Sequence, residues 1–274
     1  MQDLSTLAYV GGTLVAAMPA GRVAADLPPD RRALPPDEAA RIARFLRPQD
    51  RHEREAAHGL LRHLLGGHLG RDPETIVLER DGNGRPFLPD RPALDLNLSH
   101  GGGWVAVGLS AAGRIGVDVE GSVRPVDWDG IAPVFLHPAE LDAYRGLPAG
   151  ARARHALELW SVKEAFLKAI GEGLIAEPRS VRPIADGSAW RLARAGLSLR
   201  AGSRLLSDGV RLAWAVEGER EVAVVVGGIA GPPNRTRSDP HGKRKHPPPS
   251  CRASGATGRG RMSVRSVRPI DAQT

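Results

Sequence analysis

Two acidic side chains have the types and the spacing to bind a metal ion. Asp118 and Glu120 are alternate residues of Gly116-Val117-Asp118-Val119-Glu120, a run that the apolar alternation predicts to be a strand. Alternate strand residues project to the same side about 7 Å apart, so the two carboxylates can converge on a hard cation such as Mg²⁺. Alternate acidic residues are also common on a solvated strand face, and the spacing alone leaves both interpretations open.

Glu164 and Lys168 lie four residues apart in a segment predicted to be helical. Such a pair is ordinarily a surface ion pair with a small effect on stability. The composition favours a chemical role beyond a surface ion pair, because the 28 basic residues before position 231 include only two lysines, Lys163 and Lys168. We interpret both as positions where a compact ammonium is chemically required. A carboxylate and a lysine beside a metal-binding pair suit phosphate chemistry, since lysine can neutralise a departing phosphate.

His100 follows a predicted strand in the glycine-rich turn Ser99-His100-Gly101-Gly102-Gly103. A histidine in this position can donate a hydrogen bond to a phosphate. An isolated histidine in a turn more often has no such role, so the residues alone leave this site open.

The segments that must position these residues mix helix and strand patterns without strict βαβ alternation, which predicts the α+β class. Helical patterns cover 36–69, where the polar positions are rich in arginine, and 138–170, where Leu159, Val162, Phe166 and Ile170 form an apolar stripe. The predicted strands are 76–79, 94–99, 105–110, 115–120, 212–216 and 222–226.

Bulk composition fits a globular protein of one or two domains and decides no function class. The chain has 274 residues and a net charge of +7, but the first 230 residues hold 28 basic and 29 acidic side chains, whereas 231–274 hold 10 and 2. We predict that 231–274 is a disordered basic tail, because it is rich in Pro, Gly, Ser and Arg and lacks a periodic apolar face. It is either a tether to nucleic acid or an unselected extension. We favour the extension because no aromatic residue is interleaved among its basic ones.

The single cysteine, Cys251, excludes an internal disulfide framework, a Cys-rich zinc site and a thiol redox pair, and it suggests a reducing compartment. No apolar stretch approaches the roughly 20 residues that span a bilayer. The start of the chain carries Asp3 and no basic segment typical of a signal peptide. We therefore expect a cytoplasmic protein that does not contact membranes.

Five motifs, in order and at similar separations, resemble those of the 4′-phosphopantetheinyl transferases, specifically the larger, monomeric type that activates surfactin synthetase. The likeness covers about residues 35–230 and does not extend to the tail. The motifs are Gly84-Arg85-Pro86, Asn97-Leu98-Ser99-His100, Gly116-Val117-Asp118-Val119-Glu120, Phe135 to Glu140, and Trp160 to Lys168.

The resemblance implies two similar α+β halves related by a pseudo-twofold axis, residues 1–113 and 114–230, with coenzyme A in the cleft between them. It implies a monomer of the holo-[acyl-carrier-protein] synthase type. Such an enzyme transfers 4′-phosphopantetheine from coenzyme A to a serine of an apo acyl or peptidyl carrier protein and releases 3′,5′-ADP. The reaction depends on Mg²⁺.

By motif position, Asp118, Glu120 and Glu164 would hold Mg²⁺ together with the pyrophosphate of coenzyme A. Lys168 would contact that pyrophosphate and assist its departure, and His100 is assigned to the catalytic group as well. The serine hydroxyl must lose its proton as it attacks, so a carboxylate near the metal would be the general base, and Glu164 is our candidate.

A further set of side chains would hold the nucleotide of coenzyme A. Arg85 replaces the more usual lysine near the adenine. Glu38 stands where the family usually has a basic residue, so the 3′-phosphate pocket is either weaker or rebuilt from Arg44. Glu140 aligns with a second acidic residue near the site. The predicted nucleotide-binding residues are Arg41 and Arg54 at the 3′-phosphate, Arg85, Ser99, His100, and Lys168.

A second hypothesis is a nucleic-acid-binding protein that uses the arginine-rich segment 41–62 and the basic tail. It predicts a basic body. The first 230 residues instead carry a slight acidic excess, and this hypothesis leaves Asp118, Glu120 and Glu164 unexplained.

Overall fold

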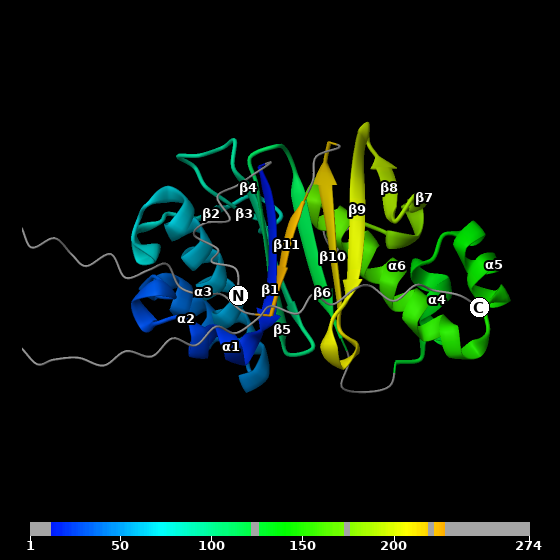
Figure 1. The fold of residues 1–274 in the computed structure, drawn as a ribbon, viewed down its shortest axis with the longest axis horizontal. Coiled ribbons are helices and arrows are strands. Elements are labelled where there is room, and N and C mark those ends of the chain that lie inside the picture. The colour runs from blue at the N-terminus through cyan, green and yellow to red at the C-terminus, as the bar shows by residue number, and fades with distance from the viewer. Residues whose placement is uncertain (1–11, 122–125, 173–175, 219–221, 228–274) are drawn as a thin grey trace, which may run out of the picture. The chain divides into compact units, whose positions relative to one another are not determined.

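Two β-sheets with helices on their outer sides make up the part of the chain that the computed structural model describes, residues 12–121, 126–172, 176–218 and 222–227 (Figure 1). The predictions for the start of the chain, for the 231–274 tail and for Cys251 lie outside the described residues. The α+β class is confirmed. Among the described helices, none combines the length and the apolar character needed to cross a membrane.

The first half of the chain builds a sheet around its first strand. After that strand come three helices, a two-residue hairpin ladder and a longer hairpin, whose second strand pairs antiparallel with both its neighbours. The elements are β1 (Thr13–Pro19), α1 (Ala20–Asp26), α2 (Pro36–Ala43), α3 (Pro48–Leu69), β2 (Glu79–Arg80), β3 (Pro86–Phe87), β4 (Asp95–Gly101) and β5 (Trp104–Ser110).

The second half repeats this order of elements. Its last long strand, β10, pairs with β6 and β9 just as β5 pairs with β1 and β4, and its third helix has the same length as α3, 22 residues. This repetition confirms the predicted pair of similar α+β halves. The elements are β6 (Ile115–Glu120), α4 (Trp128–Phe135), α5 (Pro138–Gly146), α6 (Ala149–Ile170), β7 (Ile184–Asp186), β8 (Ala189–Arg194), β9 (Leu197–Leu205) and β10 (Arg211–Glu217).

The final strand, β11 (Ala223–Val226), returns to the first sheet and pairs parallel with β1. The two sheets therefore run in the orders β11-β1-β5-β4 and β6-β10-β9-β8-β7. The first sheet therefore combines strands from both ends of the described chain, whereas the second sheet consists of strands of the second half.

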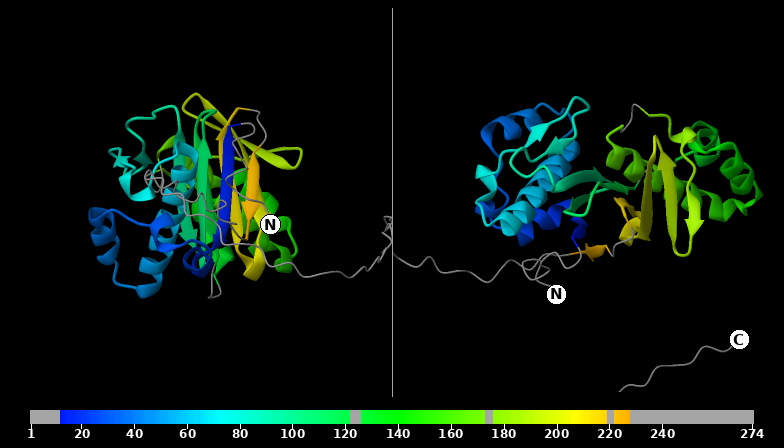
Figure 2. Two further views of the ribbon diagram at one scale, coloured as in Figure 1. Left: turned by 60° about the vertical axis from the view of Figure 1, so that its left-hand side comes forward. Right: turned by 90° about the horizontal axis from the view of Figure 1, so that it is seen from above.

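Apolar side chains fill both faces of the first sheet. In β1, Leu14 points into the core shared with Leu61 of α3, whereas Val15 points into a second core shared with Val117 and Leu212 of the other sheet. Because each face is covered, β1 and β5 read as nearly continuous apolar runs. Figure 2 shows the result, with helices at the two outer sides and the strands between them.

Local sequence accounts for where the elements begin and end. The predicted helical region 36–69 is two helices, α2 and α3, because α3 starts at Pro48 and the residue before a proline is disfavoured in helix. The predicted strand 76–79 is wrong except for its last residue, since β2 spans only Glu79–Arg80. The other five predicted strands correspond to β4, β5, β6, β10 and β11.

A row of side chains joins the two halves at the open edge of β6. None of the described strands pairs with this edge. Its N–H groups donate instead to alternate polar side chains of β4, which satisfies backbone groups that burial would otherwise leave unpaired. These hydrogen bonds fix β6, and with it Asp118, against β4. The three bonds are Ile115 N to Asp95 Oδ2 (2.7 Å), Val117 N to Asn97 Oδ1 (2.9 Å) and Val119 N to Ser99 Oγ (3.3 Å).

Gly116 lets α6 lie directly against β6. A Cβ atom at this position would come within 2.0 Å of the carbonyl oxygen of Ala165 and 2.5 Å of the amide nitrogen of Ala169. Only a residue without a side chain permits this approach, which sets Glu164 and Lys168 of α6 beside Asp118 of β6.

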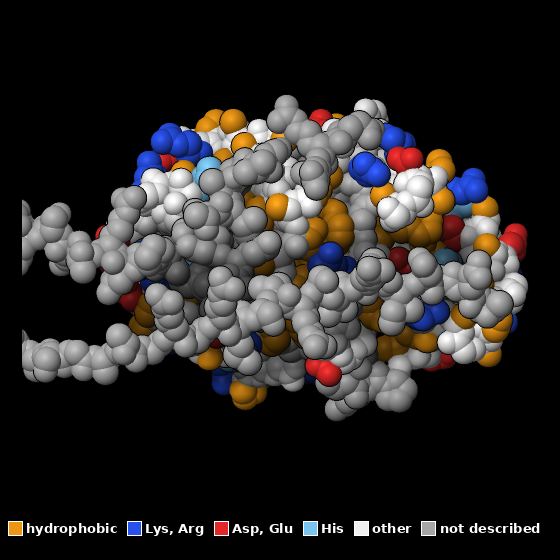
Figure 3. All heavy atoms as spheres, in the orientation of Figure 1, with side chains coloured by type: hydrophobic (Ala, Val, Ile, Leu, Met, Phe, Trp, Pro, Cys, Tyr) orange, Lys and Arg blue, Asp and Glu red, His pale blue; other side chains and the backbone are white. Residues whose placement is uncertain are grey.

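Charges of both signs are spread over the face drawn in Figure 3, where lysine and arginine side chains alternate with aspartate and glutamate around the rim of the described part. On this face the described charged side chains are of mixed sign, in contrast to the single-sign basic stripe that nucleic-acid binding predicts.

Candidate active site between the two halves

Lys168 connects three elements at the centre of the site. Its ammonium donates to Asp118 Oδ1 at 2.7 Å and to Ser99 Oγ at 2.9 Å. Asp118 is buried, with 5% of its side chain exposed, while 25% of the Lys168 side chain remains exposed. The structure therefore brings together Ser99 of β4, Asp118 of β6 and Lys168 of α6, three residues that the sequence placed in separate motifs.

Glu120 and Glu164 complete an acidic cluster around Asp118. Burial, together with the charges of Asp118 and Glu164, raises the pKa of Glu120 to about 7, against the opposing effects of the Gly121 amide and Lys168. Burial also raises the pKa of Glu164, as does the Asp118 charge, while Lys168 lowers it. These carboxylates oppose one another's ionisation, and a cation placed among them would relieve that repulsion.

The donor set fits a Mg²⁺ ion that shares its coordination with a phosphate. Asp118 Oδ2 and Glu164 Oε1 are buried and have no hydrogen-bond partner in the described part of the chain. Buried carboxylate oxygens without partners are costly, and Mg²⁺ typically takes one or two carboxylates together with phosphate oxygens and water. Among the described residues, no group of three or more His, Cys, Asp or Glu side chains is positioned to hold a metal ion. Lys168 occupies one oxygen of Asp118 instead.

A cavity of about 380 Å³ lies beside Lys168 and draws its lining from both halves. Its walls come from α3, from the turn between β2 and β3, from β4, and from the end of α6. Four of the predicted nucleotide-binding residues line it: Arg54, Arg85, His100 and Lys168. Ser99 accepts a hydrogen bond from Lys168. Arg41 does not line this cavity.

Arg85 braces the two halves as well as lining the cavity. Its guanidinium donates to Asp95 Oδ2 at 2.7 Å, to the carbonyl oxygen of Ile115 at 2.6 Å and to the carbonyl oxygen of Lys168. Only 11% of its side chain is exposed. Most of its donors are thus engaged within the protein, a role that the Gly-Arg-Pro motif does not indicate.

His100 lies against Glu53 of α3, and Arg54 of α3 lies against Phe45, which lies between α2 and α3. The Nδ1 atom of His100 lies 3.5 Å from Glu53 Oε2, and the same glutamate accepts from the amide of Gly103 in the glycine turn. Burial lowers the pKa of His100, and the charge of Arg54 lowers it further. The Arg54 guanidinium stacks on the ring of Phe45 at 3.8 Å. Glu53 is a positioning residue that the motifs did not reveal.

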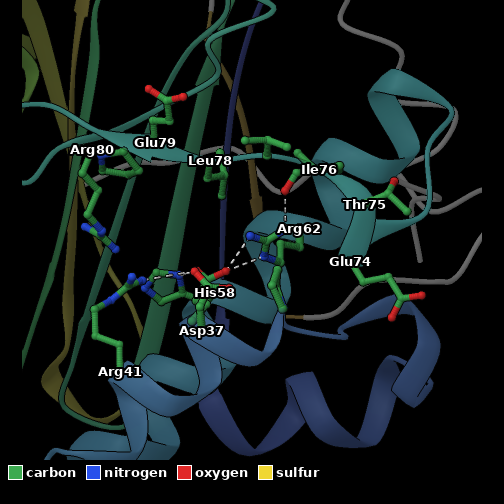
Figure 4. A pocket seen from close by; sticks show the side chains of 14 residues that line it. Asp37, Arg41, His58, Arg62, Glu74, Thr75, Ile76, Leu78, Glu79 and Arg80 are labelled. Atoms are coloured by element: carbon green, nitrogen blue, oxygen red, sulfur yellow. Dashed lines mark hydrogen bonds and ion pairs between the residues drawn. The ribbon is translucent and has the colours of Figure 1, made fainter.

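Glu38 is neutralised from within the first half. It is buried, accepts from Arg62 Nε at 2.7 Å and forms an ion pair with His58, in a cavity of about 230 Å³ next to the first (Figure 4). Burial alone would raise the pKa of Glu38, but His58 and Arg62 lower it to about 2. The acidic residue at this basic family position is therefore paired inside the protein. Arg41 lines this second cavity, 3.8 Å from Glu38.

Arg80 is a candidate site residue that sequence reasoning missed. It extends from β2 and lines both cavities, whereas the predicted substitute, Arg44, lines neither. Its position just before the turn cluster Asp81 to Pro86 was the available signal, but the pattern could not show which way the arginine points.

Lys163 and Glu140 are structural residues. The Lys163 side chain is fully buried and donates to Glu140 Oε2 at 2.6 Å and to the carbonyl oxygen of Phe135 at 2.8 Å. Glu140 also caps α5 by accepting from the amide of His137 at 2.6 Å. The compact ammonium at Lys163 therefore serves packing and not phosphate chemistry, because protein acceptors enclose it.

The arginine-rich helix is likewise engaged internally. Arg51 donates to the carbonyl oxygen of Phe45 at 2.7 Å, Arg54 stacks on the Phe45 ring, and Arg62 is buried against Glu38 and the carbonyl oxygens of Pro73 and Ile76. Arg51, Arg54 and Arg62 thus each have a partner within the protein.

An apolar groove of about 710 Å³ begins at Glu120, on the other side of the acidic cluster. Trp128, Ile131, Leu157 and Trp160 provide apolar lining, and 39% of Ile131 is exposed. Mostly apolar clefts of about 300–1,000 Å³ are typical of binding sites. The acidic cluster and Lys168 thus lie between a polar cavity and an apolar groove.

Comparisons with known proteins agree with this architecture. The model of the 4′-phosphopantetheinyl transferase superfamily matches residues 114–215, and the model of the 4′-phosphopantetheinyl transferase N-terminal domain matches residues 26–112. The two matches meet at the boundary between the duplicated halves.

Individual relatives give the same result. The chain is 37% identical over 142 residues to the 4′-phosphopantetheinyl transferase HetI of Nostoc, covering 50% of this chain and 60% of HetI. It is 36% identical over 115 residues to the transferase psf-1 of Bacillus pumilus, covering 42% and 48%. It is 28% identical over 139 residues to the transferase Sfp of Bacillus subtilis, covering 51% and 61%. The matched part thus spans about half to three fifths of these relatives.

The fold and the two family matches define a protein of duplicated α+β halves with its polar centre where the halves meet. The chain belongs to the 4′-phosphopantetheinyl transferase superfamily, and within it to the larger, Sfp-like type.

Proposed function

We propose that this protein transfers 4′-phosphopantetheine from coenzyme A to a serine hydroxyl of an apo acyl or peptidyl carrier protein, as a holo-[acyl-carrier-protein] synthase type of enzyme. The observation that carries the proposal is the position of Lys168 and the acidic cluster between a polar cavity and an apolar groove. The polar cavity suits a nucleotide, and the apolar groove suits a protein partner.

In this reaction the serine Oγ forms a bond to the β-phosphorus of coenzyme A, and the bond from that phosphorus to the bridging oxygen breaks. The products are the phosphopantetheinylated serine and 3′,5′-ADP. Lys168 neutralises the charge that develops on the departing phosphate, because its ammonium lies at the edge of the polar cavity. His100, in the wall of the same cavity, orients the nucleotide.

The proton of the serine passes to Glu164, directly or through a water. Burial and the neighbouring Asp118 raise the pKa of Glu164, which suits a general base better than a fully solvated carboxylate. Asp118 and Glu164, with Glu120 beside them, would hold Mg²⁺, whose charge offsets the negative charge on the phosphate oxygens.

The apolar groove is the side from which the carrier protein approaches. It begins at Glu120 and is lined by Trp128 and Ile131, while Arg154 adds a positive charge. Such a surface suits a partner helix with apolar and acidic side chains. We expect the reaction to take place in the cytoplasm by a monomer, with no part for nucleic acid or membrane.

Intact-mass spectrometry of apo carrier proteins tests the proposal. Each carrier is incubated with the protein, coenzyme A and Mg²⁺, and the expected result is a mass gain of one phosphopantetheine group that EDTA abolishes. The Asp118→Ala variant should give no gain, whereas Asp90→Ala, which removes an exposed carboxylate paired with Arg71, should behave as wild type. Transfer by Asp118→Ala at the wild-type rate would refute the metal assignment.

A further inference from the structure

The last turn of α6, which carries Lys168, is capped by side chains from the first half of the chain. The final carbonyl groups of a helix have no partner within the helix and form the negative end of its dipole. Here the carbonyl oxygen of Lys168 accepts from Arg85, and that of Gly171 accepts from Asn83 Nδ2 at 2.7 Å. Both donors lie in the turn between β2 and β3. A turn of one half therefore holds the end of a helix of the other half.

The backbone of this turn is fixed by its own residues. Asp81 Oδ1 accepts from the amides of Asn83 and Arg85, both at 2.9 Å. Gly84, between these two residues, has a φ of +81°, which glycine adopts without strain. A carboxylate that binds backbone amides a few residues further on stabilises a turn. The sequence Asp-Gly-Asn-Gly-Arg thus presents two side-chain donors from a defined backbone.

Arg85 also binds the two strands on either side of the junction between the halves. Its guanidinium donates to Asp95 Oδ2 of β4 at 2.7 Å and to the carbonyl oxygen of Ile115 of β6 at 2.6 Å. Only 11% of the side chain is exposed. Arg85 therefore ties the main chain of Lys168 to both β4 and β6.

The ammonium of Lys168 is held by the same two strands. It donates to Ser99 Oγ of β4 and to Asp118 Oδ1 of β6. Because the lysine side chain is a flexible four-carbon stem, the place of its ammonium depends on where the main chain lies. A displacement of about 1 Å at a reacting centre can lower a rate about 100-fold. The hydrogen bonds of Arg85 thus bear on the chemistry of Lys168.

Resting on the function proposed above, we propose that Arg85 and Asn83 are positioning residues that act through Lys168. They hold the end of α6 so that the ammonium faces the departing phosphate. Arg85 then contributes to turnover and not to the affinity for coenzyme A. An arginine suits this role better than a lysine, because its planar group of donors reaches acceptors on three elements at once.

Steady-state transfer to an apo carrier protein, together with calorimetry on coenzyme A alone, separates turnover from binding. For Arg85→Met we expect kcat to fall about 10- to 100-fold while the Kd for coenzyme A changes less than about threefold. Arg85→Lys keeps the charge but not the planar donors, so it should recover only part of the lost kcat.

The double variant Arg85→Met/Lys168→Met shows whether Arg85 acts through the lysine. Losses from independent residues multiply, whereas a positioning residue has nothing to position once the lysine is gone. The kcat of the double variant should therefore lie within about threefold of that of Lys168→Met alone.

Hydrogen exchange follows the end of α6 without any turnover. The amides of Gly171 and Glu172 donate to the carbonyl oxygens of Lys168 and Leu167 at 3.2 and 3.0 Å. Loss of the charged hydrogen bond in Arg85→Met should speed the exchange of these two amides about 10-fold or more.

Two further variants complete the test. Arg71→Met is the matched control, because it removes an arginine that is paired with Asp90 of the first half and does not line the polar cavity. It should change neither exchange nor transfer. Asn83→Ala removes one hydrogen bond and no charge, so it provides the measurement if Arg85→Met does not fold. Its kcat should fall about two- to tenfold.

Three results would overturn the inference: coenzyme A binding that weakens in Arg85→Met as much as kcat falls, losses at Arg85 and Lys168 that multiply, or unchanged exchange at the end of α6. Wild-type protein that transfers to no carrier would refute the proposed function itself. Wild-type transfer with multiplying losses would refute only this inference.

Discussion

Replacing Lys163 with methionine tests whether this lysine stabilises the fold, in contrast to Lys168, which we place in the reaction. The Lys163 ammonium is fully buried and has three oxygen acceptors, on Glu140, Phe135 and Pro178. Removing it leaves the Glu140 carboxylate buried, with the amide of His137 as its one remaining hydrogen-bond donor among the described residues. α6 would also lose its tie to the segments before and after it.

The expected loss of stability follows from the burial of the Lys163–Glu140 ion pair. Breaking a buried ion pair by removing one partner destabilises a protein by about 3–5 kcal/mol, whereas an exposed helical pair such as Arg22–Asp26 contributes about 0.3–0.5 kcal/mol. With a urea dependence of about 2 kcal/mol per molar, Lys163→Met should lower the unfolding midpoint by about 1.5–2.5 M. Arg22→Ala should move the midpoint by less than about 0.3 M.

Urea denaturation followed by tryptophan fluorescence measures these midpoints, and transfer is assayed at a temperature where each variant remains folded. Lys163→Met should keep most of its turnover, whereas Lys168→Met should lose it. The double variant Lys163→Met/Glu140→Leu should regain most of the lost stability, because both buried charges are gone. An unchanged midpoint together with abolished transfer in Lys163→Met would refute the structural role.

Other perturbations test the metal site, the charge network and the packing. Asp118→Asn should remove the Mg²⁺ dependence of any residual transfer, measured by titrating Mg²⁺. The pKa of Glu38 is about 2 when folded against 4.5 as its ordinary value, so its stabilisation is complete above about pH 4.5 and is lost as the pH falls toward 2. The whole loss amounts to about 3 kcal/mol, of which about 2 kcal/mol falls between pH 6 and pH 3, and Glu38→Gln should remove that part from the difference between the urea midpoints at these two pH values. Gly116→Ala forces a Cβ into the Ala165 carbonyl oxygen and should cost at least about 2 kcal/mol, while Gly21→Ala, with no atom within 4 Å, should be neutral or slightly stabilising.

Local pattern predicted the elements that carry the site. Period-two alternation placed Asp118 and Glu120 on one side of a strand, and helical spacing placed Glu164 and Lys168 on one face of a helix. Both predictions concern neighbours in sequence, where backbone geometry fixes the relation between side chains. They were sufficient to suggest phosphate chemistry before any tertiary contact was known.

Contacts between distant segments could not be predicted in this way. The alternation of Asp95, Asn97 and Ser99 indicated a polar strand face, but not that this face satisfies the open edge of β6. Arg80 stood in a recognisable turn region, but its direction depends on how the β2–β3 hairpin packs. In each case the deciding partner lies in another element, and the local pattern carries no information about it.

The two lysines show where a compositional argument stops. Their scarcity indicates positions where an ammonium is used in place of a guanidinium, and one physical reason applies to both. An ammonium is compact and directs three donors outward, so it fits a small enclosure of oxygens that a planar fork would overfill. At Lys168 the enclosure is open to the polar cavity, with 25% of the side chain exposed, and a phosphate can join it. At Lys163 it is closed by Glu140 and two carbonyl oxygens. A lysine at either position indicates a small enclosure of oxygen atoms. Whether that lysine can act on a substrate or only holds a helix in place depends on whether its side chain is exposed to a cavity.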